Sequence, residues 1–424
     1  MSAPFNVFVH EYFTGGGFPE GDLPGDIAAE ALGMLWALLA DFQSWGVVRT
    51  VTTLDPRLEE RIPGLNRDTL PADKVIPVPP DEHKDIFLSL LKRCDAALII
   101  APESNGILSR LSAQVEKEGV MLLGSSASAT AIAGDKEACG KILSLANLPI
   151  PKTCTADIGS AIGIAEQMGY PLVLKPLDGV SSEGICLVDD PADMPAALAN
   201  LRKRTSRERI LLQSFVDGIH ASVCLLVAEN RCLSLSLNRQ LIRTGIPFEY
   251  RGSEVPFDHA MAGYAIELAS SVVDHIPGLN GYVGVDLVIA GDSVRLIEIN
   301  PRLTTSYIGL RQVSLLAVAA DSVDKKFRLE TTRVFDCPHP ELYLYGEVSQ
   351  SQRLDGIAVQ VFEVFRFIGQ KVLCDHSYVP DMLPLLRIGN GSIFKMPREQ
   401  YDLFLICSCS GLRPLRSPSK FSFV

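Results

Sequence analysis

The chain has 424 residues, of which 47% are hydrophobic and 21% charged, and this composition predicts a globular protein of two or three domains. The formal net charge is −11 and no run of Lys and Arg resembles a nucleic-acid-binding stripe, so nucleic acid is not an expected partner. The N-terminus lacks a basic segment followed by an apolar one, and the longest apolar stretch, Ile27 to Leu39, contains Glu30 and is too short to span a bilayer, so we expect a cytoplasmic protein without a membrane partner.

The first part of the chain alternates predicted strands with predicted helices. The strands are expected at residues 7–9, 47–51, 76–78, 96–100 and 121–123. The helices are expected at residues 26–42, with Asp26 as N-cap, and 81–92. Such alternation predicts a parallel sheet, and ligands of these sheets bind at the carboxyl ends of the strands. The loop Thr14 to Gly17 and the segment Pro102 to Ser104 follow two of these strands.

From about residue 125 the pattern changes to hairpins of strands with fewer helices. Helices are predicted at residues 135–146 and 192–202. Strands are predicted at residues 170–175, 184–188, 209–212, 222–227, 232–237, 284–289 and 294–299. Gly291-Asp292 is the expected turn of the last hairpin. Beyond about residue 320 only residues 357–367, with strand-like alternation, and the apolar residues 401–407 show a pattern.

The ten cysteines are scattered along the chain without metal-ligand spacing. Cys407 and Cys409 are separated by a single residue, which is not the spacing of a zinc site. We therefore expect reduced thiols.

The first motif that carries chemistry runs from Lys175 to Gly184. A lysine at a strand end suits the α- and β-phosphates of a nucleotide, and a Gly/Ser loop that includes Ser181 and Ser182 presents amides and hydroxyls to the β- and γ-phosphates. The motif is not a P-loop, because the lysine precedes the loop and no Gly-Lys-Ser/Thr follows. Taken alone, it is equally compatible with a flexible hairpin.

The second motif places polar residues at alternating positions of an otherwise apolar hairpin. Glu298 and Asn300 share one face of their strand, and antiparallel pairing brings Asp286 beside them. Oxygen ligands of this kind suit Mg²⁺, and Arg302 has the same parity and is expected near a γ-phosphate. A solvated acidic hairpin is the alternative, and it fits the surrounding apolar residues poorly.

The order of these motifs resembles the ATP-grasp superfamily: an early lysine at Lys136, the loop after Lys175, a hinge at residues 212–218, and the acidic hairpin. The resemblance covers about residues 125–310. It implies an α/β protein with a Rossmann-like pre-ATP-grasp domain followed by a two-subdomain ATP-grasp fold (α+β). The expected boundaries are 1–124 for the pre-ATP-grasp domain, 125–205 for the lid subdomain, 206–322 for the subdomain with the metal site, and 323–424 for a C-terminal extension.

The resemblance also implies a set of ATP-binding residues. They are Lys136, Lys175, Ser181, Ser182, Gly184, Gln213, Ser214, Phe215, Val216 and His220. Gln213 stands where the family usually has a glutamate, and His220 where a ribose-binding glutamate is usual. Both side chains form hydrogen bonds without a fixed negative charge, so the preference for ATP is left open, and His220 has a structural role as its alternative.

The segment His10 to Gly17 resembles, more narrowly, the opening of tyramine–glutamate ligases of methanofuran biosynthesis and their bacterial relatives in C1-cofactor metabolism. Pro102-Glu103 and Asn238-Arg239-Gln240 fit the same resemblance. It implies substrate-binding roles for Glu11, Thr14, Gly15, Gly16, Glu103 and Arg239, with Glu11 or Glu103 as the counter-charge of a cationic amine. A tight strand-to-helix turn is the alternative for the glycines, which do not form a dinucleotide fingerprint, and helix capping is the alternative for Glu103.

Taken together, the resemblance implies an ADP-forming carboxylate–amine ligase that uses ATP and Mg²⁺, with two ions expected and Mn²⁺ as a substitute. A small carboxylate attacks the γ-phosphate, and the acyl phosphate then reacts with an amine, with Lys175, Arg251 and Arg302 as catalytic residues. For Arg239 and Arg251, surface ion pairs are the alternative. A D-alanine–D-alanine-like or other amino-acid ligase and a non-catalytic ATP-binding regulatory protein are the competing functions. The two substrates and the oligomeric state, a homodimer included, are left open.

Overall fold

The structure is a computed structural model that describes residues 4–319, except 20, 22, 178–183, 206, 229 and 230. Four short strands further on, at residues 325–330, 349–350, 387–388 and 392–393, are described as well. The strand-like pattern at 357–367, the apolar residues 401–407, Cys407 and Cys409 lie outside the described residues. Among the described helices, none is long and apolar enough to cross a membrane.

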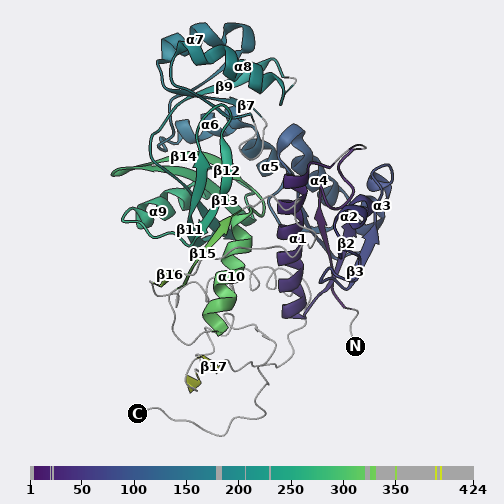
Figure 1. Cartoon of the computed structure of the whole chain (residues 1–424). Coiled ribbons are helices and arrows are strands. Elements are labelled where there is room, and N and C mark those ends of the chain that lie inside the picture. Colours follow the sequence, from purple (N-terminus) through teal and green to yellow (C-terminus); the bar gives the residue numbers. More distant parts are fainter. Residues whose placement is uncertain are drawn as a thin grey trace.

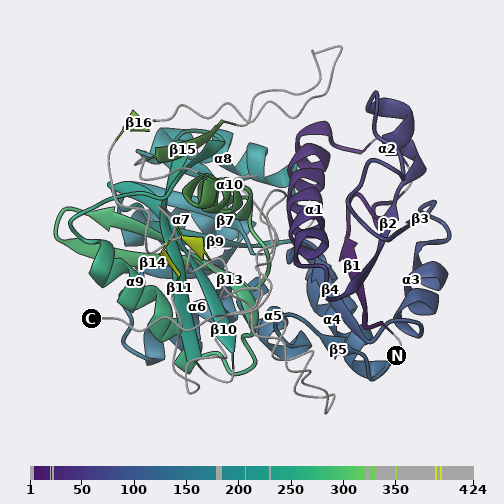
Figure 2. The ribbon, with the colours of Figure 1, turned by 90° about the horizontal axis from the view of Figure 1, so that it is seen from below.

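The N-terminal domain is a parallel sheet with helices on both faces (Figures 1 and 2). Its strand order is β3-β2-β1-β4-β5. The strands are β1 (Asn6–Glu11), β2 (Arg49–Leu54), β3 (Lys74–Pro77), β4 (Ala96–Ile100) and β5 (Met121–Leu122). The helices are α1 (Gly25–Trp45), α2 (Pro56–Arg61), α3 (His83–Leu91) and α4 (Ile107–Lys117).

Alternating residues of β1 explain this packing. Val7 and Val9 pack with α1, whereas Phe8 packs with α3 and α4. Helix α1 begins at Gly25, so Asp26 lies in its first turn and is not the N-cap that we predicted. The N-cap is Pro24, whose extended conformation, with φ −60° and ψ 119°, ends the preceding loop.

A second, antiparallel sheet forms the lid at the top of Figure 1. Its order is β6-β9-β7-β8, with β6 (Thr153–Asp157), β7 (Leu172–Pro176), β8 (Cys186–Val188) and β9 (Arg209–Ser214). Helices α7 (Ala161–Met168) and α8 (Met194–Arg202) pack on this sheet. The expected boundary at residue 205 falls before β9, whereas β9 hydrogen-bonds to both β6 and β7.

The third part is a large antiparallel sheet of order β14-β13-β10-β11-β12-β15-β16. Its strands are β10 (Ile219–Ala228), β11 (Arg231–Arg243), β12 (Glu249–Val255), β13 (Gly281–Ala290), β14 (Ser293–Asn300), β15 (Lys325–Glu330) and β16 (Ser349–Gln350). Helices α5 (Ala127–Gly134), α6 (Lys136–Leu145) and α9 (Ala262–Ser271) pack against it. A two-stranded pair, β17 (Arg387–Ile388) and β18 (Ser392–Ile393), is separate from these sheets.

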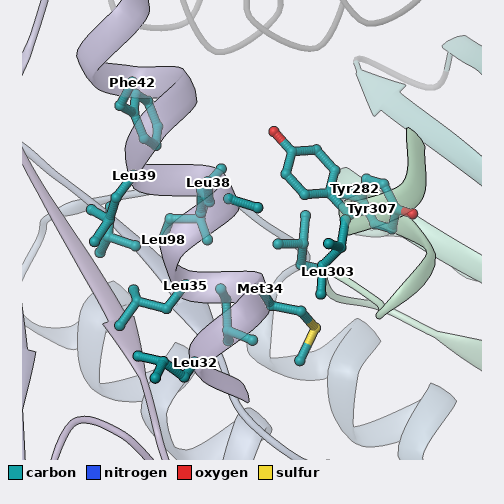
Figure 3. Close-up of a cluster of buried hydrophobic side chains, with 14 of the residues drawn as sticks. Leu32, Met34, Leu35, Leu38, Leu39, Phe42, Leu98, Tyr282, Leu303 and Tyr307 are labelled. Carbon is teal, nitrogen blue, oxygen red and sulfur yellow. The ribbon is translucent and has the colours of Figure 1, made fainter. Parts of the chain in front are cut away.

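Helix α1 connects the N-terminal sheet to the large sheet through one continuous apolar core. Figure 3 shows Met34 and Leu38 on the side of α1 that faces Leu303 and Tyr282. Helix α10 (Ser306–Ala319) joins this core through Tyr307. The two domains are therefore held at a fixed separation, and their facing edges define the site described next.

Candidate active site

One cavity lies where the N-terminal sheet, the lid and the large sheet meet, and it is lined by residues from all three. Its lid end is lined by Val173, Lys175, Ile185, Gln213, Ser214, Phe215, Val216, His220 and Phe248. Its centre is lined by Ser222, Gln240, Asp286, Glu298, Asn300 and Arg302. Its opposite end, called the acidic compartment below, is lined by Glu11, Phe13, Ile27, Glu30, Ala31, Met34, Ile100, Ala101, Pro102, Thr304, Thr305 and Ser306.

At the lid end, Lys175 is a buried cation at the end of β7. Its Nζ donates to Gln213 Oε1 at 2.8 Å, and Gln213 Nε2 in turn donates to Thr153 Oγ1 at 3.1 Å. Burial, aided by nearby Lys136, lowers the pKa of Lys175 to about 8, although Glu298 and Asp286 oppose the shift. A buried lysine held in this way is well placed to meet an anionic group such as a phosphate.

The end of β9 and the start of its connection to β10, from Gln213 to Val216, lie along the wall of the same end. The amides of Ser214 and Phe215 donate to Lys152 O at 2.8 Å and Pro171 O at 3.1 Å, which fixes this backbone. His220 lies edge-on to Phe248, with ring centroids 6.1 Å apart. Burial and the nearby Lys175 lower the pKa of His220, which favours the neutral form of its ring. This wall can hold a flat, uncharged ring.

In the centre, the registers of β13 and β14 place the polar residues side by side. Asp286 is the partner of Glu298, Gly284 is the partner of Asn300, and a bulge follows Asp286. Asn300 Nδ2 donates to Asp286 Oδ2 at 3.2 Å, and Gln240 Nε2 donates to Asp286 Oδ1 at 3.0 Å. Burial and the neighbouring Glu298 raise the pKa of Asp286 to about 7.

Two facing carboxylates in a buried site fit a divalent cation, because a bound cation removes the repulsion between them. Among the described residues no group of three or more His, Cys, Asp and Glu side chains converges on one point. The oxygen atoms that could take part in such a site belong to Asp286, Glu298 and the amide of Asn300. Such an oxygen set, completed by water and ligand phosphates, suits Mg²⁺ better than Zn²⁺.

Two ion pairs flank this centre. Lys136 Nζ lies 2.8 Å from Glu298 Oε1, so the predicted early lysine reaches the carboxylates although it does not line the cavity. Arg302 Nε lies 2.9 Å from Glu103 Oε1; Glu103 is buried and Arg302 is largely buried. Burial opposes the charge of Arg302, but Glu103, Glu298 and Asp286 together raise its pKa. Glu103 is thus engaged with Arg302 and does not line the cavity.

In the acidic compartment, Glu11 ends β1 and is 2% exposed. Its Oε2 accepts hydrogen bonds from Thr14 N at 2.6 Å and Thr14 Oγ1 at 2.7 Å. Burial raises the pKa of Glu11 to about 7 against these hydrogen bonds. Glu30, on α1, is the second carboxylate of the compartment.

Thr14, Gly15 and Gly16 do not line the cavity. The close packing around Gly15 and Gly16 leaves no room for a side chain at either position. A Cβ at Gly15 would lie 2.4 Å from Thr53 Oγ1, and one at Gly16, where φ is +84°, would lie 2.3 Å from Val78 O. These contacts support the tight-turn interpretation of the glycines. Thr14 acts through its two hydrogen bonds to Glu11.

The remaining predicted residues are not brought to the cavity by the described part of the chain. Arg239 lies 5.9 Å from the Phe257 ring, and Arg251 Nη2 lies 3.1 Å from Glu249 Oε2. Gly184 has φ +73° and precedes β8. Ser181 and Ser182 lie outside the described residues.

The sequence analysis gave no site role to several lining residues, among them Glu30, Ser222 and Gln240. For Glu30 a signal exists, because it is the one charged residue between Ile27 and Leu39 on a buried helix. Gln240 contacts Asp286, which lies 46 positions further along the sequence, and Ser222 on β10 is the register partner of Asp286. Neither contact has a local sequence signal.

The architecture and this site define the class of protein. A family model described as an ATP-grasp domain matches residues 133–306, and one described as a pre ATP-grasp 3 domain matches residues 48–130. The chain belongs to the ATP-grasp family. The predictions of this fold, of this family and of a ligase family that forms carbon–nitrogen bonds with ATP are confirmed.

Within the family, the chain is similar to tyramine–L-glutamate ligases of two archaea. It is 33% identical to that of Methanocaldococcus jannaschii over 59% of this chain and 71% of the relative. It is also 33% identical to that of Methanocaldococcus fervens over 61% of this chain and 78% of the relative. Among solved structures, an ATP-grasp superfamily protein from Archaeoglobus fulgidus aligns with a TM-score of 0.57 at 25% identity, covering 77% of this chain and 92% of that one.

Proposed function

We propose that this chain joins the carboxylate of a small acid to a primary amine, using ATP and two Mg²⁺ ions, through an acyl phosphate. The observation that carries the proposal is that one cavity is lined by a buried lysine, a pair of facing carboxylates and an acidic compartment. Each part would bind a different reactant, and the reaction requires these reactants to lie next to one another.

The lid end would hold the nucleotide. Lys175 and Lys136 supply positive charge for the phosphates, and the wall from Gln213 to Val216 with His220 and Phe248 holds the base and sugar. Asp286, Glu298 and Asn300 would hold Mg²⁺, with Mn²⁺ as a substitute. When bound, the metal neutralises charge on the β- and γ-phosphates.

The centre would then position the acid. Its carboxylate oxygen attacks the γ-phosphorus, the bond from γ-phosphorus to the bridging oxygen breaks, and ADP leaves. The amine nitrogen, after its ammonium form has given a proton to solvent, attacks the resulting acyl carbon and loses a second proton to solvent, the bond from that carbon to the phosphate oxygen breaks, and an amide and phosphate form. Arg302 faces this point and stabilises the oxygen on which charge develops. Enclosure by three parts of the chain limits the access of water to the acyl phosphate.

For the substrates, the similarity to tyramine–L-glutamate ligases favours L-glutamate as the acid and tyramine as the amine. An amino-acid ligase is the second candidate, because a D-alanine–D-alanine ligase of Desulforudis audaxviator is 26% identical over 59% of this chain. A regulatory protein that only binds nucleotide is the third, and the facing carboxylates argue against it.

A product screen tests the proposal. Pairs of acids and amines are incubated with the full chain, ATP and Mg²⁺, ADP is measured, and products are identified by mass. We expect one acid–amine pair to give equal amounts of ADP, phosphate and amide. Glu298→Gln should abolish this turnover with the fold retained, whereas Glu267→Gln, at an exposed position of α9, should not. ADP release that needs neither acid nor amine would contradict the proposal.

A further inference from the structure

The acidic compartment combines two carboxylates with apolar walls. Ile27, Glu30, Ala31 and Met34 follow the i, i+3, i+4, i+7 spacing of one helix face, so α1 presents a single stripe to the cavity. Phe13 adds an aromatic side chain beside Glu11. A ligand in this compartment therefore meets negative charge at one point and apolar surface elsewhere.

The compartment is also separate from the nucleotide end. Glu11 and Ile100 are register partners at the carboxyl ends of β1 and β4. In the order β3-β2-β1-β4-β5, the chain turns to opposite sides of the sheet at these two strands, and this is where α/β sheets bind ligands. Charge interactions link Lys175 to Asp286 and Glu298, these two carboxylates to Arg302, and Arg302 to Glu11. An occupant of the compartment therefore reaches the centre from the side opposite the nucleotide.

The charges of the lining residues limit what this occupant is. Among the described lining residues, those with a basic side chain are Lys175, His220 and Arg302. Lys175 and His220 belong to the lid end, and Arg302 is ion-paired with buried Glu103 at 2.9 Å. In the acidic compartment, an α-carboxylate would face Glu11 and Glu30. The nearby Arg302, whose charge also reaches Glu11, is already paired with Glu103, so the added negative charge would be poorly balanced, which is costly in a buried site.

We propose that the acidic compartment binds the amine substrate as a primary amine that has an apolar body and no carboxylate, and that Glu30 is the residue that selects it. This inference rests on the ligase function proposed above. Glu11 and Glu30 contact the ammonium group, and the stripe of α1 with Phe13 packs on the apolar body. Thr305 Oγ1 donates to Glu30 Oε2 at 3.4 Å and orients the Glu30 carboxylate toward the cavity.

Matched pairs of amines test the inference. Each pair differs only by the α-carboxylate: tyramine and tyrosine, tryptamine and tryptophan, isoamylamine and leucine. For the amine that the wild-type chain uses best, we expect kcat/KM to exceed that of the matching amino acid by about 100-fold or more, as for an uncompensated buried charge. In Glu30→Gln, kcat/KM for the amine should fall about tenfold, the ratio between amine and amino acid should narrow, and the KM for ATP should stay within about twofold.

Glu60→Gln is the matched control, because Glu60 is an exposed glutamate of the same domain outside the cavity. Glu30→Asp, which keeps the charge, should recover part of the selectivity. An amino acid used as well as its amine, or a Glu30→Gln variant that behaves like Glu60→Gln, would overturn the inference while the ligase function stands. If no acid and amine together release ADP, the ligase function itself fails.

Discussion

At the scale of single residues, burial shifts the pKa values of the ionisable side chains in the cavity toward their neutral forms. It disfavours the charged form, so it raises the pKa of Glu11 and Asp286 and lowers that of Lys175. Of these three, Glu11 stands apart from the residues that would hold metal, and its neighbours are Thr14, Phe13 and Arg302. Its titration therefore offers a direct test of how the compartment is built.

The first prediction is that Glu11 makes stability depend on pH. The pKa of Glu11 is raised from 4.5 to about 7, so the folded chain binds more protons than the unfolded chain between these values. The contribution of Glu11 to the free energy of unfolding is thus fully present below pH 4.5 and is lost as pH rises through 7. Relative to Glu11→Gln, the wild type should lose on the order of 3 kcal/mol between pH 4 and pH 8.

Chemical denaturation of both proteins at several pH values measures this difference, and thermal unfolding provides a check on each variant. A difference that stays constant across this range would show that Glu11 is solvated in the folded chain. In that case the enclosed compartment described above does not exist.

At the scale of elements, the hairpin of β11 and β12 reaches across to the lid. Leu187 N donates to Gly245 O at 2.8 Å, and Phe248 N donates to Ile185 O at 2.7 Å. The loop between the two strands therefore pairs with the residues around β8. Phe248, which is 8% exposed, brings its ring against His220 in the same place.

The second prediction is that Phe248→Ala weakens nucleotide binding. Loss of the ring removes part of the wall that Phe248 forms with residues 213–216 and His220, and one contact between lid and large sheet, so the KM for ATP should rise about tenfold, equivalent to about 1.4 kcal/mol. Tyr264→Ala, at a position of α9 that is 46% exposed, serves as the control. An unchanged KM for ATP, with the KM for the amine raised instead, would place the nucleotide at the other end.

Local patterns predicted most of the elements that carry the site. The polar alternation at Asp286, Glu298 and Asn300 predicted neighbouring side chains, and the two-residue turn at Gly291-Asp292 fixes the register that brings them together, with Gly291 at φ +59°. Sequence analysis gave β11 only as residues 232–237 and did not find β12 or α9. Polar residues at Arg239 to Arg243 and Glu249 to Glu254 conceal the strand alternation. Glu249 pairs with Arg243 and Arg251 within the hairpin, and Gln240 donates to Asp286 in the cavity.

Local sequence patterns do not predict contacts between segments that are distant in the sequence. Glu103 was expected to meet the amine, but it pairs with Arg302, which lies in another domain. A carboxylate after a strand has the same local sequence in either case. The packing of α1 and the N-terminal sheet on the large sheet decides that Glu103 pairs with Arg302. The same packing leaves Glu11 and Glu30 at the cavity.

At the scale of the whole molecule, helices α1 and α10 join the two domains through a buried polar link. Asp41 on α1 accepts from Tyr307 Oη at 2.6 Å and from Arg311 Nε at 2.6 Å. Arg311 is 8% exposed and also lies 5.5 Å from the Trp36 ring. Because α1 and the start of α10 both line the acidic compartment, this link fixes its width.

The third prediction is that Asp41→Ala destabilises the chain by about 3–5 kcal/mol, because it leaves the buried guanidinium of Arg311 without its carboxylate. Asp81→Ala, at an exposed position of the same domain, should change stability by less than about 0.5 kcal/mol. Denaturant unfolding measures both. Equal stability of the two variants would mean that the apolar core around α1 joins the domains without help from this link.

The account rests above all on an acyl phosphate formed in the cavity, and oxygen transfer tests it most directly. The acid identified by the product screen is labelled with ¹⁸O in its reacting carboxylate and converted with ATP, Mg²⁺ and the amine. We predict that each molecule of phosphate released carries one ¹⁸O, because the carboxylate oxygen that attacks phosphorus leaves with it. Unlabelled phosphate alongside a labelled amide, or ¹⁸O recovered in AMP, would contradict the account.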